Sequence, residues 1–600
     1  MAELPTYCLK ISWKWAATLI FFTASFLFFY FFCREQIIYH EQQQLFQYNL
    51  AYLLRLTAIP GGISQYISAF FLQFFLYAWT GALIFTFFVF AVFFAVNLIF
   101  RHTGISTRFS ILPLFPAAAY CLMMYDYKFN LVWLISFVAS LMFFAFYVSV
   151  FRNKNSLFFG GLGLVALYFV SPVSMLYSTS LIVIYELLFG KKSSKYRQIA
   201  VYMSIAIILP VLVSRTIFVA TPFDTYLTGF PDKETAWTLF LTSFAWIFAP
   251  VMMLLVYCFS FFSNEKTKKY YKTPVISAAI LIVFITLSLH HVIDKRIPMM
   301  LRMNYEVNRE NWTETLRISR NYPTGNHLVA YYTNLALHKT GQMFSNFFDY
   351  RQTGPSGLIL DWRLDFLTAM AGGEVFYHLG FTNEANRWAF EALVASKSGE
   401  NPILLKRLVK TAIINENYAI AEKYLHILKQ TLFYKKWAKK YLEILNDSDK
   451  IDNLTWVSQK RSQWIEDDFL SGRVAPANLP LFFNQNPDNK MAFEYLMMYY
   501  LLTKNIDEFM KNIDRVADYD YTAMPPIFEE VVLIYLNMQD AELEEYMRYP
   551  IKAESFERFY EYVQIFQQLA NNPQLQRREL SRKFGNTYWY YLHFFNQPAI

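Results

Sequence analysis

The residues whose types and spacing could do chemistry are two carboxylates in a polar stretch that follows an apolar run. Glu35 and Glu41 lie just after that run, and Glu41 belongs to HEQQQLFQYN (residues 40–49). If 34–54 is one helix, a step of 100° per residue places Glu41 in the middle of an apolar stripe and Glu35 at its edge, with His40 and the glutamines opposite. An ionised carboxylate is costly in lipid, so Glu41 must be paired, protonated or open to water.

A cation is the expected partner for such a carboxylate, and the candidate is Arg215 in VLVSRTIFVA. Arg215 lies about five residues, or roughly 8 Å, short of the end of its own apolar run. One interpretation is that its long side chain simply reaches the membrane interface. The other is that it holds a lipid-linked phosphate beside Glu41.

Other chemical motifs are missing from the sequence. HEQQQ lacks the second histidine of a zinc-binding helix, and His290 with His291 falls at the end of an apolar run, where an interfacial position is favoured over metal binding. No Walker sequence, CxxC pair or nucleophile elbow occurs. We therefore predict no metal site, and the sequence leaves any cofactor unknown.

The elements that must position these residues are long apolar segments. Hydrophobic residues make up 55% of the 600-residue chain and aromatic residues 20%, which is too apolar for a wholly soluble protein. The long apolar runs precede His291, so we expect a transmembrane domain at 1–293 and a soluble domain at 294–600. About 20 helical residues cross the bilayer core, and about nine runs are candidate spans. They are 11–32, 80–100, 109–125, 131–151, 157–170, 173–189, 200–218, 236–262 and 275–290.

Two parts of this domain differ from simple membrane spans. Residues 34–79 are expected to form an interfacial amphipathic region between the first two spans. The fifth and sixth candidates are short and are separated only by Ser171 and Pro172. The segment 157–189 therefore either spans the membrane twice or forms a re-entrant hairpin.

Basic residues gather at one set of span ends. About fourteen lysines and arginines, among them Arg152, Lys191 and Lys268, lie at the ends that the positive-inside rule assigns to the cytoplasm, against about four opposite. We therefore interpret the formal net charge of +8 as a topology signal and predict no nucleic-acid partner. The N-terminus is expected in the cytoplasm, and 294–600 outside it.

Residues 294–600 alternate helix-length segments with short turns and contain few glycines. In 374–396 the spacing of Ala385 and Trp388 is typical of two closely packed antiparallel helices, and an offset of about 36 residues to Ala421 is near the tetratricopeptide period. We therefore predict an all-α fold in which a polytopic transmembrane bundle is followed by an extracytoplasmic tetratricopeptide-like repeat domain. This domain either holds a partner on a concave surface or packs as a lid on the membrane domain.

Four motifs near the N-terminus carry a family resemblance: YHEQQQLFQYN (39–49), IPGG (59–62), FFLQFF (70–75) and YAWTGALI (77–84). Together they resemble the signature of an uncharacterised family of Bacteroidota polytopic inner-membrane proteins with a domain of unknown function. The resemblance implies a multi-pass protein of the bacterial inner membrane with a periplasmic C-terminal domain, and it implies no particular activity. Pro60-Gly61-Gly62 is expected to end the amphipathic helix.

The topology is also similar, more distantly, to that of GT-C glycosyltransferases, which carry a catalytic acid in their first outer loop. That likeness implies Glu41, or else Glu35, as the catalytic base and Arg215 as a clamp on the carrier phosphate. The loop departs from the GT-C pattern because it lacks an acidic pair.

Two functions follow as expectations. The first is an integral inner-membrane protein that presents a periplasmic helical-repeat domain for partner binding or envelope assembly. The alternative is a GT-C-like glycosyltransferase that uses a polyprenyl-phosphate-linked sugar donor. The expected partners are the lipid bilayer and either a periplasmic protein or a lipid-linked sugar.

Overall fold

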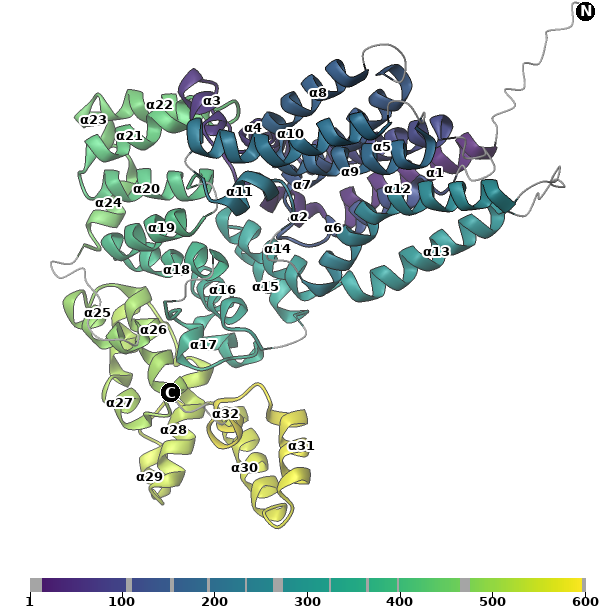
Figure 1. The fold of residues 1–600 in the computed structure, drawn as a ribbon. Helices are drawn as coiled ribbons and strands as arrows, with labels where there is room; N and C mark the ends of the chain where they lie inside the picture. The colour runs from purple at the N-terminus through teal and green to yellow at the C-terminus, as the bar shows by residue number, and fades with distance from the viewer. Residues whose placement is uncertain are drawn as a thin grey trace, which may run out of the picture. The chain divides into compact units, whose positions relative to one another are not determined.

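The computed structural model describes residues 13–103, 111–151, 156–190, 195–218, 220–231, 235–262, 273–322, 325–362, 366–396, 399–464 and 475–595. Within these ranges the chain is helical and has no β-strand, which confirms the predicted all-α class (Figure 1). It divides into two compact units, residues 1–295 with 430–433 and residues 296–429 with 434–600. Arg152, Lys191 and Lys268, which helped to orient the spans, lie outside the described residues.

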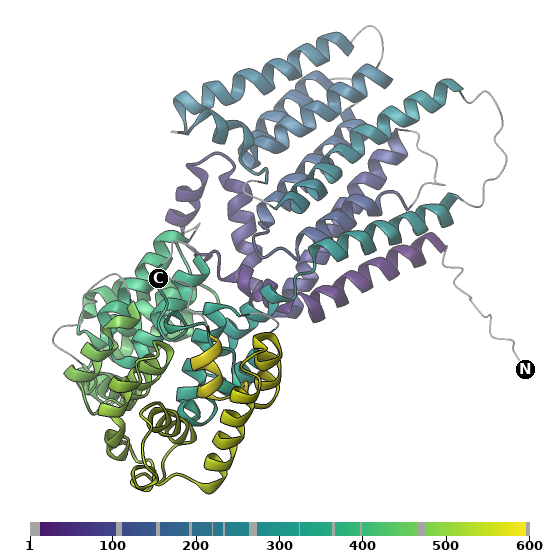
Figure 2. The ribbon, with the colours of Figure 1, turned by 90° about the horizontal axis from the view of Figure 1, so that it is seen from below.

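The first unit contains the segments predicted to span a membrane, and each of them contains a helix. Its long helices lie alongside one another in Figure 2. The apolar helices are α1 (Trp13–Phe32), α5 (Ala78–His102), α6 (Leu114–Met123), α7 (Leu131–Phe146, continued by a π turn over Tyr147–Phe151), α8 (Ser156–Val170), α9 (Pro172–Phe189), α10 (Lys195–Thr216), α12 (Ala236–Phe262) and α13 (Thr273–Val292), with the short α11 (Pro222–Leu227) between α10 and α12.

The lengths of these helices reduce the number of candidate spans. In the described part of the chain, α5, α7, α9, α10, α12 and α13 are long and apolar enough to cross a membrane. A seventh candidate arises if α1 is joined to α2 (Arg34–Glu41), from which it is bent by 76°. By contrast, α6 has 10 residues and α8 has 15, which is less than the roughly 20 residues that a full span needs.

Buried hydroxyl groups join α7 to the start of α9. Ser174 Oγ donates to the Ser136 carbonyl at 2.7 Å, and Ser136 Oγ donates to Ser171 Oγ at 2.9 Å. Small side chains let two helices approach closely, and these bonds satisfy the hydroxyls without water. Pro172 begins α9, where a missing backbone N–H is harmless. The predicted break at Ser171 and Pro172 is therefore present, and α8 packs against α9 across it.

The chain after α1 is not one continuous helix. It forms α2, an irregular stretch over residues 42–49, and α3 (Leu50–Thr57). The Asn49 side chain begins α3 by accepting a hydrogen bond from the Tyr52 backbone N–H at 2.6 Å. The assumption of helical periodicity across 34–54 is therefore wrong, because an asparagine cap starts a new helix there.

An aromatic cluster accounts for the interruption. Phe46 is buried, and its ring packs edge-on against Tyr52, Tyr66 and Phe70. Aromatic pairs in this geometry add to the stabilisation from burial. The irregular stretch thus lets Phe46 enter a small core of its own.

The Pro-Gly-Gly motif follows the end of α3 at Thr57, close to where it was predicted to end the amphipathic helix. Gly61 has a φ of +72°, a conformation that glycine adopts without strain. It precedes α4 (Gly62–Leu72), and the 3-10 turn η1 (Gln73–Leu76) then leads into α5.

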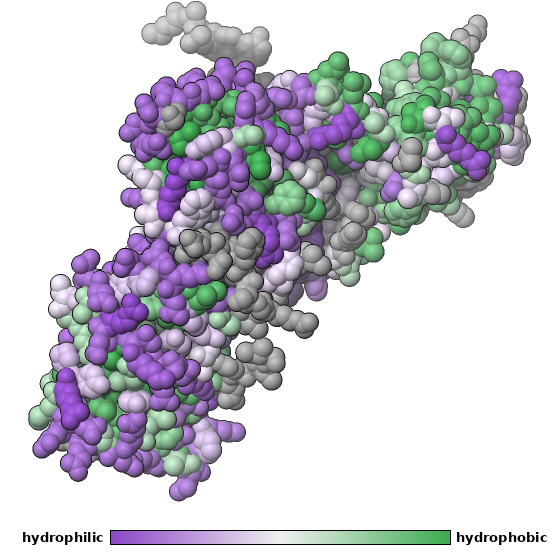
Figure 3. All heavy atoms as spheres, turned by 90° about the vertical axis from the view of Figure 1, so that its left-hand side faces the viewer, coloured by the Kyte–Doolittle hydropathy of each residue, from purple (hydrophilic) through white to green (hydrophobic). Residues whose placement is uncertain are grey.

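The second unit is a succession of helices joined by short turns, and hydrophilic residues cover most of the visible face of its C-terminal helices (Figure 3). Its helices are α14 (Arg296–Asn308), α15 (Trp312–Arg320), α16 (His327–Lys339), α17 (Met343–Asn346), α18 (Phe366–Leu379), α19 (Thr382–Ala395), α20 (Pro402–Ile414), α21 (Tyr418–Lys429), α22 (Lys435–Leu445), α23 (Ser448–Asp452), α24 (Thr455–Arg461), α25 (Leu479–Gln485), α26 (Lys490–Leu502), α27 (Ile506–Lys511), α28 (Pro526–Met538), α29 (Leu543–Tyr546), α30 (Ala553–Gln568), α31 (Pro573–Phe584) and α32 (Tyr588–Phe594).

The helix pair expected over 374–396 is present as α18 and α19. The two helices pack against each other and turn at Gly380, whose φ is +97°. Trp388 on α19 is 1% exposed, and the lack of a side chain at Gly372 on α18 makes room for its ring. The pair α20 and α21 repeats the plan, and Asn401 caps α20 by accepting hydrogen bonds from two backbone N–H groups.

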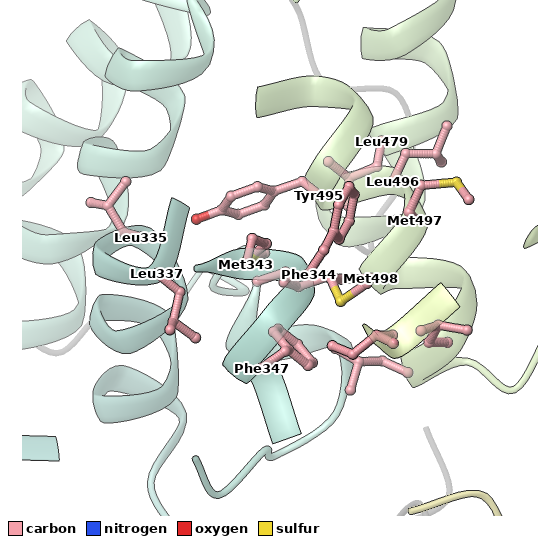
Figure 4. Packing of buried hydrophobic residues seen from close by; sticks show 14 of the residues in the cluster. Leu335, Leu337, Met343, Phe344, Phe347, Leu479, Tyr495, Leu496, Met497 and Met498 are labelled. Carbon is pink, nitrogen blue, oxygen red and sulfur yellow. The ribbon is translucent and has the colours of Figure 1, made fainter. Parts of the chain in front are cut away.

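The core of this unit is large and rich in aromatic residues. Figure 4 shows Leu335 and Leu337 from α16 beside Phe344 from α17 and Phe347, which follows α17 directly. Tyr495 to Met498 on α26 face the same core. Because the described second unit has no disulfide, this packing must supply most of its stability.

One buried carboxyl makes the stability of this unit depend on pH. Glu530 on α28 is buried; its Oε2 accepts a hydrogen bond from the Tyr588 N–H at 2.7 Å. Burial raises the pKa of Glu530 to about 8. The folded unit therefore binds the Glu530 proton more tightly than the unfolded chain does. The stability that this proton contributes to the folded unit is fully present below about pH 4.5 and is lost as the pH rises through 8.

Glu530→Gln keeps an acceptor oxygen but cannot become charged. We therefore expect this variant not to lose stability as the pH rises. Above pH 8 the variant should be more stable than the parent chain by on the order of 3 kcal/mol. Urea unfolding of the full chain in detergent at pH 5 and pH 9 measures the difference. An unchanged pH dependence in the variant would show that Glu530 is not its source.

Candidate functional site

The predicted catalytic carboxylates lie on α2. Glu41 is its last residue and is 3% exposed, whereas Glu35 in the first turn is half-buried. The helix packs mainly against α1, η1 and α5. Glu41 therefore lies inside the protein and not on a lipid-facing surface, in agreement with the high cost of exposing a charge to hydrocarbon.

Polar residues close to Glu41 in the sequence are also buried, although the assumed helix placed His40 and the glutamines opposite the apolar stripe. Gln36, His40 and Gln42 are all buried. Both side-chain polar atoms of Gln36, His40 Nε2 and Gln42 Oε1 have no hydrogen-bond partner among the described residues. The His40 ring lies against Phe129, so a neighbouring loop covers this side of α2. Buried polar atoms without partners mark places where proteins bind water or a polar ligand.

Arg215 occupies a different setting from Glu41. It lies in the last turn of α10 and is exposed. α10 packs mainly against α8, α9 and α11, none of which is a main neighbour of α2. The structure thus places Glu41 and Arg215 on elements with different packing partners, and the Arg215 side chain at the surface.

An apolar groove of about 420 Å³ lies between α8 and α10. Val165 lines it from α8, and Ala200, Ile205 and Leu212 from α10. No titratable side chain lines this groove, so it offers hydrophobic contact rather than catalysis.

A second polar site, which the sequence did not reveal, lies in the second unit. Glu374 on α18 and Arg407 on α20 form an ion pair in which Arg407 Nη2 lies 2.6 Å from Glu374 Oε2. The Arg407 guanidinium also lies 3.8 Å from the centroid of the Tyr377 ring. The two partners are 33 residues apart, so the repeat period was the signal that could have linked them.

Neither site resembles a metal centre. In the described residues, no three His, Cys, Asp or Glu side chains come together as a set that could hold a metal ion.

The fold by itself defines the class of protein. It is an all-α protein with several apolar helices long enough to cross a membrane and a second, helical unit of mixed composition. The chain belongs to DUF6057, a family of unknown function, whose model matches residues 11–595. No curated protein and no solved structure matches the chain.

Proposed function

We propose that this protein is a multi-span protein of the bacterial inner membrane that presents residues 296–600 to the periplasm as a helical-repeat domain. In this proposal the repeat domain binds a partner, either a protein or a component of the envelope under assembly. The observation that carries the proposal is the arrangement of α18 to α21, in which successive helix pairs bond to each other through residues one repeat apart.

Two contacts support the repeat. Glu374 pairs with Arg407, and Thr382 Oγ1 donates to Asn415 Oδ1 at 2.5 Å, each across 33 residues. An interval of 33 is close to the tetratricopeptide period of about 34 residues. Stacked helix pairs of this kind create extended surfaces that usually hold a peptide or another protein.

The membrane topology has separate support. The described chain has six or seven helices of spanning length, and basic residues gather at the span ends assigned to the cytoplasm. The same rule directs the part of the chain after α13 to the opposite side.

The alternative function is a GT-C-like glycosyltransferase acting on a polyprenyl-phosphate-linked sugar. It is favoured by one observation, namely that Glu41 is buried on the same short helix as Gln36 and His40, whose buried polar atoms have no partner among the described residues. Such a setting could bind sugar hydroxyls.

Photo-crosslinking in living cells tests the partner-binding proposal. We expect benzoylphenylalanine at Lys339, an exposed residue at the end of α16, to give an adduct of defined mass after irradiation. The same probe at Lys423, an exposed residue on α21, is the matched control and should give no such adduct.

The two functions predict opposite effects of Glu41→Gln. If the repeat domain is the binding part, the Lys339 adduct persists in the Glu41→Gln chain. Absence of an adduct, together with failure of Glu41→Gln to restore the envelope of a deletion strain at normal protein levels, would reject partner binding in favour of the enzyme.

A further inference from the structure

Three helices of the second unit carry four positively charged side chains, and two of these side chains lie against the ring of Tyr377. We call this set the cationic cluster; it consists of Lys339 on α16, Arg407 and Lys410 on α20, and Lys460 on α24. Lys460 Nζ lies 5.2 Å from the centroid of the Tyr377 ring, and Arg407 lies 3.8 Å from it. Both cations therefore share one aromatic ring, which attracts cations but adds no negative charge.

Arg407 is fixed by an ion pair, but one nitrogen of its guanidinium group has no hydrogen-bond partner among the described residues. Its side chain is 16% exposed, and Nη2 bonds to both carboxylate oxygens of Glu374. Its Nη1 is buried and has no hydrogen-bond partner among the described residues. A guanidinium offers five N–H donors in a fixed plane, and donors left unpaired in a buried site are costly.

Lys460 is also fixed in place. Its Nζ donates to the His378 carbonyl at 3.0 Å and to Gln463 Oε1 at 3.1 Å. The next residue, Arg461, donates to the carbonyls of Ile413 and Ile414 and so ties α24 to the end of α20. An ammonium group has three donors, so Lys460 can donate one more bond.

The carboxylates near the cluster do not balance it. Glu374 is committed to Arg407, and Glu310 is exposed at the end of α14. The buried Glu494 attracts Lys339 only weakly, and it is already bonded to the His338 ring at 2.6 Å and to Tyr521 Oη at 2.5 Å.

The titration of the cluster reflects this excess of positive charge. The pKa of Lys460 is lowered to about 7, first by burial and then by repulsion from Lys339 and Arg407. The pKa of Lys410 is also lowered by burial and by Arg407. Burial and the surrounding cations lower the pKa of His378 well below its ordinary value, so its ring contributes no further charge at neutral pH.

We propose that the cationic cluster binds the phosphate group of an anionic ligand, with Arg407 Nη1 and Lys460 Nζ as donors and Lys339 and Lys410 supplying further positive charge. A phosphate fits better than a single carboxylate, because it carries up to two negative charges and enough oxygens for several donors. This inference rests on the proposed binding role of the second unit and names the chemistry that it recognises.

Binding of pyrophosphate to the full chain in detergent tests the proposal. We expect titration calorimetry to show saturable binding that Lys460→Gln and Lys410→Gln each weaken about tenfold or more, because each removes a charged contact. Lys423→Gln on α21 removes a charge outside the cluster and should leave the affinity unchanged. Arg407→Lys keeps the charge but loses the planar pair of donors, and it should also weaken binding.

The source of the phosphate is distinguished with a second probe. Liposomes with and without phosphatidic acid show whether a lipid headgroup competes with pyrophosphate at the cluster. Binding that Lys460→Gln leaves unchanged, that sulfate matches at equal ionic strength, or that is undetectable with both probes would overturn the proposal. A Lys339 adduct obtained alongside such a result would reject the phosphate site while leaving partner binding supported.

Discussion

Alkaline phosphatase fused after Ile600 is expected to be active, and green fluorescent protein fused at the same point is expected to be dark. The reason is the segment 263–272, which lies between the last two apolar runs and contains Lys266, Lys268, Lys269 and Lys272. Basic segments between spans remain in the cytoplasm, so we expect α13 to carry the following chain to the other side.

The matched control places the same two reporters after Lys268. There the result should invert, with bright fluorescence and an inactive phosphatase, which shows that both reporters fold in this chain. Fluorescence after Ile600 would reverse the predicted orientation and remove the basis for a periplasmic binding domain.

Replacing Trp388 by alanine is expected to destabilise the second unit by about 3–5 kcal/mol. Trp388 is buried between α18 and α19, and a side-chain carbon at Gly372 would lie 2.3 Å from its ring. Gly372→Ala should therefore cost about 1–3 kcal/mol in the parent chain, since neither the ring nor the helix can move away freely.

The two substitutions should not be additive. Once Trp388→Ala has removed the ring, Gly372→Ala should become neutral or stabilising by up to about 1 kcal/mol, because alanine favours a helix over glycine. Pulse proteolysis of the full chain in detergent and urea measures all four variants. Gly325→Ala is the control, since its added carbon would meet its nearest neighbour only at 3.5 Å. If Gly372→Ala lowered the stability equally in the parent chain and in the Trp388→Ala chain, the contact between Gly372 and the Trp388 ring would be contradicted.

The helical segments of the first unit could be predicted because they depend on local composition. Long apolar runs must satisfy their backbone hydrogen bonds internally, and a helix does so within one segment. The ends of α6 were less predictable, because turns and neighbouring helices determine where an apolar helix stops, whereas α8 agrees closely with the predicted segment 157–170 and is simply short for a span. The sequence therefore indicated about nine spans, whereas six or seven helices within the described ranges have spanning length.

The candidate site at Glu41 could be predicted only in part. The type of the residue and its place after an apolar run marked it as costly to expose, and it is buried. The burial of Gln36 and His40 was missed because it depends on Phe46 and Asn49 interrupting the helix and on a loop that lies elsewhere in the chain.

The sequence by itself determined an all-α chain, an apolar first half and helix pairs in the second half, because these follow from the composition and spacing of residues near one another in the chain. Only the tertiary structure decided that Glu374 meets Arg407 and that Lys460 joins them beside Tyr377. Such contacts arise when helices far apart in sequence pack together, and the cost of burying their charges depends on every side chain around them.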